Sequence, residues 1–425
     1  MFYLIINANW YFCNSVPLSM NGPSKKIPIP ASLTATYLQT QEEQLEVEHK
    51  KGKLFIGIPK ESTFQEHRIA LVPSSVNALT NQGHRVLLEN DAGLKSNFTD
   101  HDYSEAGATI AYSKEEVYKS DILIKVAPPT LEEIDLMRPN QILLSPLHLP
   151  ALTRELLAKL KAKRVIGIAI EYIQDDAGSF PVVRSMSEMA GLSVMLTAAE
   201  LLAKSKGVLL AGISGVPPAK VVILGAGVVA EFAARTAIGL GAEIRIFDNN
   251  IYKLMRLQNH LGQKLYTSSF DPVVLAYEIA HADVVIGAVH SKTGRSPVIV
   301  TESMVQKMKP GSVIIDASID QGGCFETSQI TTHDNPTFVQ HGVIHYCIPN
   351  ISSKVAQTAS QALSNILTPL LMQAHHAGGI ENLMYTSYGL RHGVYVYKGS
   401  LTNPHLGKRF QISSTDIDLL MTSNL

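Results

Sequence analysis

The most specific chemical feature of the sequence is a glycine-rich turn. The segment GAGVVA (225–230) reads Gly-x-Gly-x-x-Ala, directly after an apolar run at 221–224 and at the start of a helix predicted from residue 228. In such a turn the first glycine permits the sharp bend, and the second lets the backbone approach a pyrophosphate at the helix N-terminus. Asp248 ends the next predicted strand, where a carboxylate accepts hydrogen bonds from the ribose of NAD and repels the 2′-phosphate of NADP. The pattern favours an NAD site over a strand–helix turn that binds no nucleotide.

Four further polar side chains lie near the ends of predicted strands or in the loops that follow them: Arg68, Lys125, His148 and Asp320. An arginine can bind a carboxylate through two hydrogen bonds, and a lysine can polarise a carbonyl. A histidine can carry a proton near neutral pH, and an aspartate can orient the imidazole or balance its charge. Taken singly, each also has a structural explanation, such as an ion pair, a satisfied core histidine or an aspartate that shapes a turn. Together they form a consistent set for acid–base chemistry on a small substrate.

The elements that would position these residues alternate along the chain. Short β-rich runs predict strands at 54–59, 84–90, 121–127, 141–148, 164–173, 220–224, 243–248, 283–289 and 312–318. Helices are predicted at 73–82, 100–107, 114–119, 151–162, 187–205, from 228, and at 358–378. This alternation is typical of βαβ units, so the predicted fold class is α/β with largely parallel sheets. In such sheets ligands bind at the carboxyl ends of the strands, where the candidate residues lie.

Composition narrows the functional classes. The 425 residues include 36 Lys plus Arg against 37 Asp plus Glu, which argues against nucleic acid as a partner because phosphate contacts need a basic face. No uninterrupted apolar stretch approaches the roughly 20 residues that span a bilayer, so no membrane partner is expected. The three cysteines, Cys13, Cys324 and Cys347, form neither a disulfide framework nor a metal-ligand pattern. We therefore expect no metal and a reducing, cytoplasmic location.

The first 52 residues differ from the rest. Residues 1–20 carry no charged side chain, and the first Lys is Lys25. A secretory signal has basic residues ahead of its apolar run, so this order favours a start that is absent from the native protein over a signal peptide or an ordered arm. Residues 21–52 are polar, with three prolines and an acidic run. We expect a flexible arm over 1–52, of which 1–19 is not native.

Several motifs in one order make the sequence resemble the alanine dehydrogenase family: GIPKE…EHRIAL (57–71), LIKVAPP (123–129), LHL (147–149), SMSEMAG (185–191), GAGVVA (225–230), IDQGGCFE (319–326) and the segment around Asn350. The resemblance spans roughly residues 54–390. It implies two Rossmann-like, doubly wound α/β domains with a cleft between them. A discontinuous catalytic domain would cover 53–183 and 357–425, and an NAD-binding domain would cover 184–356.

The resemblance also implies a role for each candidate residue. Arg68 would bind the substrate carboxylate, and Lys125 would contact its carboxylate or carbonyl oxygen. His148 would be the acid–base residue, with Asp320 as its catalytic partner. Ser187 would contact the cofactor phosphates and Asp248 its ribose, and the remaining cofactor contacts would come from Gly225, Gly227, Val228, Val229, Lys253, Val289, His290, Ile319, Asn350 and Ile351.

The sequence departs from the family pattern at two places. The loop HSKTG (290–294) replaces a more apolar loop that contains proline, and Ala230 replaces the third glycine of the fingerprint. The residues before the start of the resemblance and those beyond about 390 follow no common pattern.

The function that the resemblance implies is an NAD-dependent L-alanine dehydrogenase, which interconverts L-alanine with pyruvate and ammonium. The family suggests a homo-oligomer, a hexamer. One alternative is the nucleotide-binding subunit of a proton-translocating transhydrogenase, which needs no amino-acid-binding set. Another is a non-enzymatic NAD sensor or scaffold with a partner at the tail, although an oligomer contact or a packed edge explains better the tail residues Tyr395, Tyr397, Lys408 and Arg409.

Overall fold

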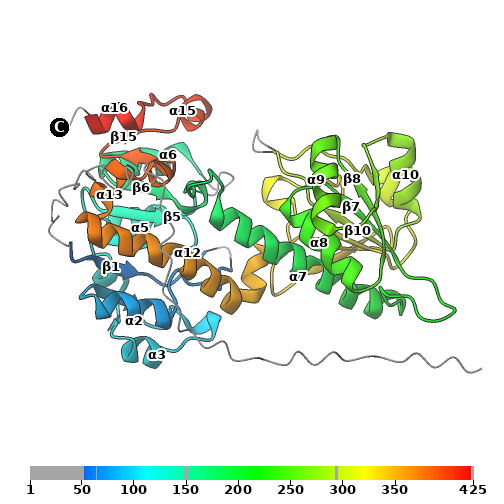
Figure 1. Ribbon diagram of the computed structural model, residues 1–425, viewed down its shortest axis with the longest axis horizontal. Helices are drawn as coiled ribbons and strands as arrows, with labels where there is room; N and C mark the ends of the chain where they lie inside the picture. Colours follow the sequence, from blue (N-terminus) through cyan, green and yellow to red (C-terminus); the bar gives the residue numbers. More distant parts are fainter. Residues whose placement is uncertain (1–51, 64, 148–151, 292–294, 423–425) are drawn as a thin grey trace, which may run out of the picture. The chain divides into compact units, whose positions relative to one another are not determined.

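The computed structural model describes residues 52–63, 65–147, 152–291 and 295–422 (Figure 1). Nearly all of the expected arm over 1–52, the predicted catalytic residue His148 and the loop residues 292–294 lie outside the described residues. The described chain contains two separate sheets, one of eight strands and one of seven.

The first sheet has the order β15-β14-β6-β5-β4-β1-β2-β3. Its strands are β1 (Phe55–Ile58), β2 (Arg85–Glu89), β3 (Thr109–Ala111), β4 (Ile122–Ile124), β5 (Ile142–Ser145), β6 (Ile166–Ala169), β14 (Val394–Tyr397) and β15 (Ser400–Leu401). Strands β1 to β6 are parallel, and their order reverses between β1 and β4. This is the doubly wound arrangement that the family resemblance implied.

The second sheet has the order β12-β13-β11-β10-β7-β8-β9. Its strands are β7 (Lys220–Leu224), β8 (Glu243–Phe247), β9 (Tyr266–Ser268), β10 (Val284–Gly287), β11 (Val313–Asp316), β12 (Thr337–Gln340) and β13 (Val343–Tyr346). All pairs are parallel except β12 with β13. Every residue of β10 and β11 is buried, which explains their continuous apolar sequences, because both faces of a parallel sheet are covered. The predicted pair of Rossmann-like folds is confirmed.

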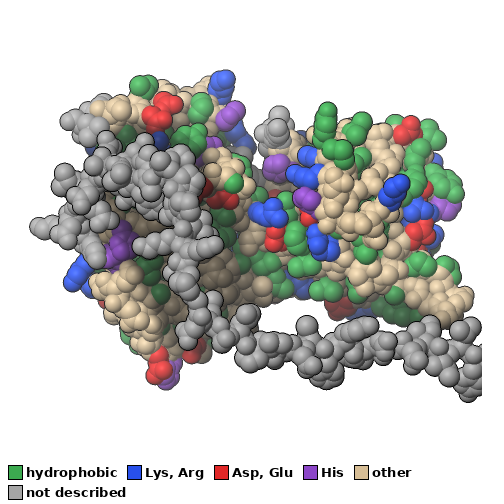
Figure 2. All heavy atoms as spheres, in the orientation of Figure 1, with side chains coloured by type: hydrophobic (Ala, Val, Ile, Leu, Met, Phe, Trp, Pro, Cys, Tyr) green, Lys and Arg blue, Asp and Glu red, His purple; other side chains and the backbone are tan. Residues whose placement is uncertain are grey.

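Helices follow most strands, and several of them lie near the predicted ranges 73–82, 100–107, 114–119, 151–162 and from 228. The shorter helices are α2 (Pro73–Asn81), α3 (Asp100–Glu105), α4 (Lys114–Val117), α5 (Leu131–Leu136), α6 (Arg154–Ala162), α8 (Val228–Gly239), α9 (Ile251–Leu261), α10 (Pro272–Ala280), α11 (Glu302–Val305), α13 (Ile380–Thr386), α14 (Tyr388–His392), α15 (Pro404–Phe410) and α16 (Ile417–Thr422). In Figure 1, α8, α9 and α10 surround the strands β7, β8 and β10. On the face drawn in Figure 2, basic and acidic side chains are interspersed over the part of the molecule that holds α8, α9 and α10. The net charge of the whole sequence is also near zero.

The long helix α7 (Pro181–Lys206) connects the two sheets along the chain. It begins six residues earlier than predicted because Pro181 takes the first helical position, where its missing N–H costs nothing. A Cβ at Gly191 would lie 2.5 Å from the carbonyl oxygen of Val229, so this glycine lets α7 pack closely on α8. By length and composition α7 could cross a membrane, although 44% of its most apolar window is buried inside the protein. Its close packing on α8 is that of a core helix.

The second long helix, α12 (Ala356–Ala377), returns the chain to the first sheet, as predicted for 358–378. Hydroxyl groups on one face of α12 accept hydrogen bonds from the segment that leads into α2: Ser360 from the backbone N–H of Ile69 and Ser364 from that of Val72. The proposed boundary at 183/184 falls inside α7, and the boundary at 356/357 falls at the start of α12. The domain limits themselves stay a prediction.

The tail adds an antiparallel edge to the first sheet. Strand β14 pairs with β6, and Tyr395 and Tyr397 are buried. A Cβ at Gly167 would lie 2.9 Å from the ring of Tyr395, so the glycine in β6 leaves room for this ring. The two tyrosines therefore belong to a packed edge.

Candidate functional site

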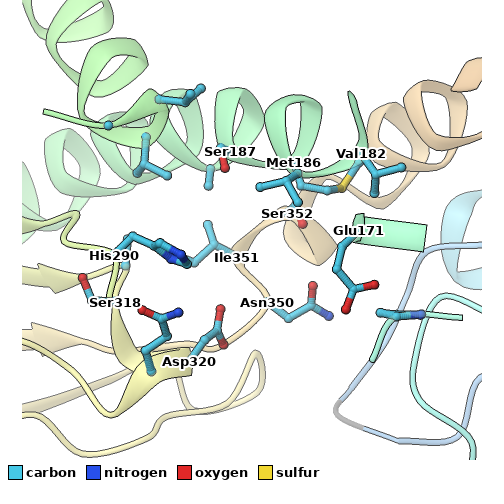
Figure 3. A pocket seen from close by; sticks show the side chains of 18 of the residues that line it. Glu171, Val182, Met186, Ser187, His290, Ser318, Asp320, Asn350, Ile351 and Ser352 are labelled. Atoms are coloured by element: carbon cyan, nitrogen blue, oxygen red, sulfur yellow. The ribbon is translucent and has the colours of Figure 1, made fainter. Parts of the chain in front are cut away.

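One cavity of about 520 Å³ is lined by residues that follow strands of both sheets. Arg68, Val126, Pro146 and Glu171 follow strands of the first sheet, and residues 227–229, 288–290, 317–321 and 350–352 follow strands of the second. Figure 3 shows Val182, Met186 and Ser187 projecting from α7 on one side of the pocket and His290, Asp320 and Asn350 on the other. Within each sheet, the carboxyl ends of the parallel strands meet at one edge. This explains why each sheet contributes lining residues from segments that are distant in sequence.

The glycine turn lies where the strand order of the second sheet reverses, between β7 and β10. Gly225 has a φ of +106°, and a Cβ there would lie 2.3 Å from the carbonyl oxygen of Ala288, so only glycine fits. Gly227 is the N-cap of α8 without a side-chain capping bond, and a Cβ there would meet no atom within 4 Å. The first N–H groups of α8 therefore adjoin open space beside the cavity. This arrangement fits the pyrophosphate of a dinucleotide.

Asp248 and Lys253 lie near this turn, although neither lines the cavity. Asp248 follows β8 and ties its end to the glycine turn, because Oδ2 accepts a hydrogen bond from the backbone N–H of Ala226 at 2.8 Å. Lys253 lies in the first turn of α9. Burial and the charge of Lys253 lower the pKa of His290, which lies after β10 and lines the cavity. The contacts of these residues with a cofactor stay predictions.

Arg68 lines the cavity, and one side of its guanidinium is bound to Glu66. Nε donates to Oε1 of Glu66 and Nη2 donates to Oε2, each at 2.7 Å. Nη1 donates to the hydroxyl of Ser352 at 2.9 Å and contacts the sulfur of Met186 at 3.1 Å. The ion-pair explanation considered for Arg68 is therefore present together with its position at the cavity.

Lys125 is buried after β4, with 1% of its surface exposed. Its Nζ donates to Glu61 at 2.8 Å and lies 3.3 Å from Oε2 of Glu133. Burial acts to lower the pKa of Lys125, but the charges of Glu61 and Glu133 hold that pKa above its usual value. A buried lysine must bind an anion or a carbonyl, or lose its charge, and here two carboxylates pair with it. A contact between Lys125 and substrate stays a prediction.

Asp320 is exposed to the cavity from the short 3-10 helix Ile319–Gln321, which follows β11. The loop that carries it is held by Asp316, whose carboxylate accepts hydrogen bonds from the backbone N–H groups of Ser318 and Cys324, each at 2.9 Å. Burial raises the pKa of Asp316. The Cys324 thiol is fully buried beside this carboxylate, and burial raises its pKa well above the usual range, so it is no nucleophile.

Ser187, Asn350 and Ile351 line the same cavity, as do Val228, Val229 and Val289. Ile319 is buried and does not itself line the cavity. Asn350 has a left-handed backbone and precedes the 3-10 helix Ile351–Val355. Its Nδ2 donates to Oε2 of Glu66 at 2.6 Å, so this predicted cofactor residue also contacts the loop that carries Arg68.

Four carboxylates near the cavity were given no role at the level of sequence: Glu61, Glu66, Glu133 and Glu171. Glu171 lines the cavity and accepts a hydrogen bond from the backbone N–H of Leu147 at 2.6 Å, immediately before His148 in the sequence. The only signal for Glu61 and Glu66 is that they share one loop with Arg68. The partners of Glu133 and Glu171 follow from the order of strands, which the sequence alone does not give. In the described part of the chain, no cluster of three or more His, Cys, Asp or Glu could hold a metal ion.

Comparison with known proteins places this chain in a family. Residues 57–190 match the model described as "Alanine dehydrogenase/PNT, N-terminal domain", and residues 194–404 match "Alanine dehydrogenase/PNT, C-terminal domain". An alanine dehydrogenase of Staphylococcus saprophyticus is 39% identical over 369 residues, which are 86% of this chain and 99% of that protein. The chain belongs to the alanine dehydrogenase/PNT family.

Other members of the alanine dehydrogenase/PNT family are also similar over most of the chain. An alanine dehydrogenase of Staphylococcus epidermidis is 40% identical over 367 residues, 85% of this chain and 98% of that protein. A solved L-alanine dehydrogenase is 39% identical with a TM-score of 0.78, covering 84% of this chain and 99% of that one. A transhydrogenase from Sinorhizobium meliloti is 25% identical with a TM-score of 0.70, covering 82% and 99%.

Membership of the alanine dehydrogenase/PNT family makes this chain an oxidoreductase with a nicotinamide cofactor. The family match runs to residue 404, beyond the limit near 390 that the motifs suggested. The difference has a structural reason, since β14 and β15 pair into the first sheet and are part of the fold.

Proposed function

We propose that this protein is an NAD-dependent L-alanine dehydrogenase, which oxidises L-alanine to pyruvate and ammonium and catalyses the reverse reaction. The observation that supports this most is that one cavity is lined by the glycine turn, by Arg68 and by Asp320. Relatives that are 39–40% identical are named alanine dehydrogenases, whereas the transhydrogenase is 25% identical. These identities therefore favour an alanine dehydrogenase over a transhydrogenase subunit.

The nicotinamide, when bound, accepts hydride from the α-carbon of alanine or returns it to iminopyruvate. The first turn of α8 would bind the pyrophosphate, together with Ser187, and Asp248 would bind the ribose. The carboxylate of Asp248 favours NAD over NADP because a 2′-phosphate would meet a like charge.

The protein's own residues would bind and orient the amino acid. Arg68 would hold the substrate carboxylate, and Lys125 would contact its carboxylate or carbonyl oxygen. His148 would take and return protons during formation and collapse of the carbinolamine, with Asp320 as its partner. Arg68 and Asp320 both line the cavity, so both side chains adjoin the space in which the substrate would lie.

We also propose a cytoplasmic homo-oligomer, a hexamer. Several large apolar side chains are exposed on α7 and on the loop that follows it: Leu192, Leu196, Leu209, Ile213 and Val216. Apolar surface of this kind is typical of contacts between subunits. Light scattering of the purified protein gives its mass directly, and a monomer would contradict this part of the proposal.

The function is tested by steady-state oxidation of NADH with pyruvate and ammonium. We expect turnover that requires all three compounds and that falls strongly when NADPH replaces NADH. The variant His148→Ala should bind pyruvate like the wild type yet turn over far more slowly. Absence of turnover in the wild type, or equal transfer from NADH to an NADP analogue without pyruvate, would reject the assignment.

A further inference from the structure

The guanidinium of Arg68 is committed on one side. Its Nε and Nη2 donate to the two oxygens of Glu66, and the backbone N–H of Arg68 also donates to Oε1, at 2.9 Å. A carboxylate in this position binds the side edge of the guanidinium through two parallel hydrogen bonds, the strongest geometry that an arginine offers. A substrate carboxylate that bound this edge would have to displace Glu66.

Glu66 is held too firmly to be displaced. Oε2 also accepts a hydrogen bond from Nδ2 of Asn350 at 2.6 Å, and Oε1 accepts one from the hydroxyl of Ser353 at 3.2 Å. Burial acts to raise the pKa of Glu66, but the charge of Arg68 and these hydrogen bonds hold that pKa below its usual value. Glu66 is 3% exposed, so it is a fixed, ionised partner of the arginine.

On the Nη1 side the guanidinium contacts neutral partners, which a charged carboxylate can replace more easily than it can replace the ionised Glu66. Nη1 reaches Ser352 and Met186, both of which line the cavity with Arg68. We propose that Glu66 is a positioning residue, which fixes Arg68 so that the Nη1–Nη2 edge receives the substrate carboxylate end-on. This inference rests on the proposed function and names how its carboxylate site is built.

The neighbours of Glu66 hold the same loop in place. Gln65 accepts a hydrogen bond from the backbone N–H of His333 and donates to Asp334, each at 2.6 Å. The backbone N–H of His67 donates to the hydroxyl of Ser353 at 2.9 Å. The loop is thus anchored to residues that precede and follow β13, and Glu66 is the point where Arg68 and Asn350 meet.

The test is direct binding of pyruvate to Glu66→Gln, measured by titration calorimetry with and without NADH. A glutamine keeps the size but turns an NH₂ group toward the donors of Arg68 or Asn350. We expect pyruvate to bind about 10- to 100-fold more weakly, the usual effect of losing a charged hydrogen-bond partner. The NADH dissociation constant should stay within about twofold, and in turnover KM for pyruvate should rise much more than kcat falls.

Glu278→Gln is the matched control, because Glu278 is also buried and ion-paired, with Lys220 and Arg245, but does not line the cavity. It should bind pyruvate like the wild type. Unchanged pyruvate binding in Glu66→Gln would overturn the proposal, as would equal weakening of pyruvate and NADH. Tighter pyruvate binding would show that Glu66 competes with substrate. A wild-type protein that binds no pyruvate would instead reject the function on which the inference rests.

Discussion

At the scale of single residues, Lys125 shows how burial dictates partners. An ammonium group that is 1% exposed must be paired, and it lies between Glu61 and Glu133. Oε1 of Glu61 also accepts the backbone N–H of Val126 at 2.6 Å, so the same carboxylate joins the loop after β1 to the end of β4. This pairing lies at the ends of β1 and β4, the two strands between which the strand order reverses.

Removing the charge of Lys125 should therefore destabilise the fold. Lys125→Met keeps the length of the side chain but leaves two buried carboxylates without their shared cation. We expect the free energy of unfolding to fall by about 3–5 kcal/mol in urea titrations. Lys159→Met, which breaks the exposed pair with Asp135, should cost less than about 1 kcal/mol. Equal losses for the two variants would contradict this account.

We expect Asp248 to govern the choice between NADH and NADPH in the proposed enzyme. Asp248→Asn removes the charge that opposes a 2′-phosphate but keeps an oxygen for the N–H of Ala226. The preference for NADH over NADPH in kcat/KM should narrow by about 10- to 100-fold. Glu243→Gln, at the partly exposed start of the same strand, should leave the preference unchanged. An unchanged preference in Asp248→Asn would remove Asp248 from the ribose site.

At the scale of elements, the two glycines of the fingerprint have separable roles. Gly225 is required by the fold, since it has a positive φ and touches Ala288, whereas space is open around Gly227. Gly225→Ala should lower the melting temperature strongly because of strain and a backbone clash. Gly227→Ala should melt like the wild type but weaken NADH binding at least about tenfold, because its methyl group enters the pyrophosphate space.

Calorimetric melting and NADH fluorescence titration measure the two effects. Gly239→Ala is a suitable control, because Gly239 ends α8 and a Cβ there would also meet no atom within 4 Å. If Gly227→Ala binds NADH as the wild type does, the pyrophosphate lies elsewhere.

The elements also show what the sequence could predict. Strands such as β7, β10 and β11 were predicted because continuous apolar runs reflect burial on both faces. The antiparallel edge at β14 and β15 was not, because its role depends on pairing with β6, which is more than 200 residues earlier. The candidate site followed the same rule: Arg68 and Asp320, after strands, were named from the sequence and line the cavity, whereas the contact of Glu66 with Asn350 forms only through the fold.

At the scale of the whole molecule, buried histidines link stability to pH. Burial lowers the pKa of His84, His333 and His345 below the ordinary value of about 6.5. The nearby charges of His375 and His67 lower the pKa of His84 and His333 further. The folded state therefore binds these protons less readily than the unfolded state does.

Because these histidines have a lowered pKa in the folded state, their contribution to the free energy of unfolding is fully present above about pH 6.5. That contribution is lost as the pH falls through the folded-state pKa. We expect the free energy of unfolding in urea to decline from pH 7.5 to pH 6. His345→Gln, at the most buried of these histidines, should flatten the decline. Stability that is constant or rising over this range would contradict the assignment of neutral, buried histidines.

In the proposed enzyme, the cavity would bring the nicotinamide and the α-carbon of alanine together. The most direct measurement uses NADH deuterated at the transferable C4 position, with pyruvate and ammonium, and mass spectrometry of the products. We expect L-alanine that carries one deuterium at its α-carbon. Deuterium in lactate or in a reduced NADP analogue, or alanine without the label, would contradict it.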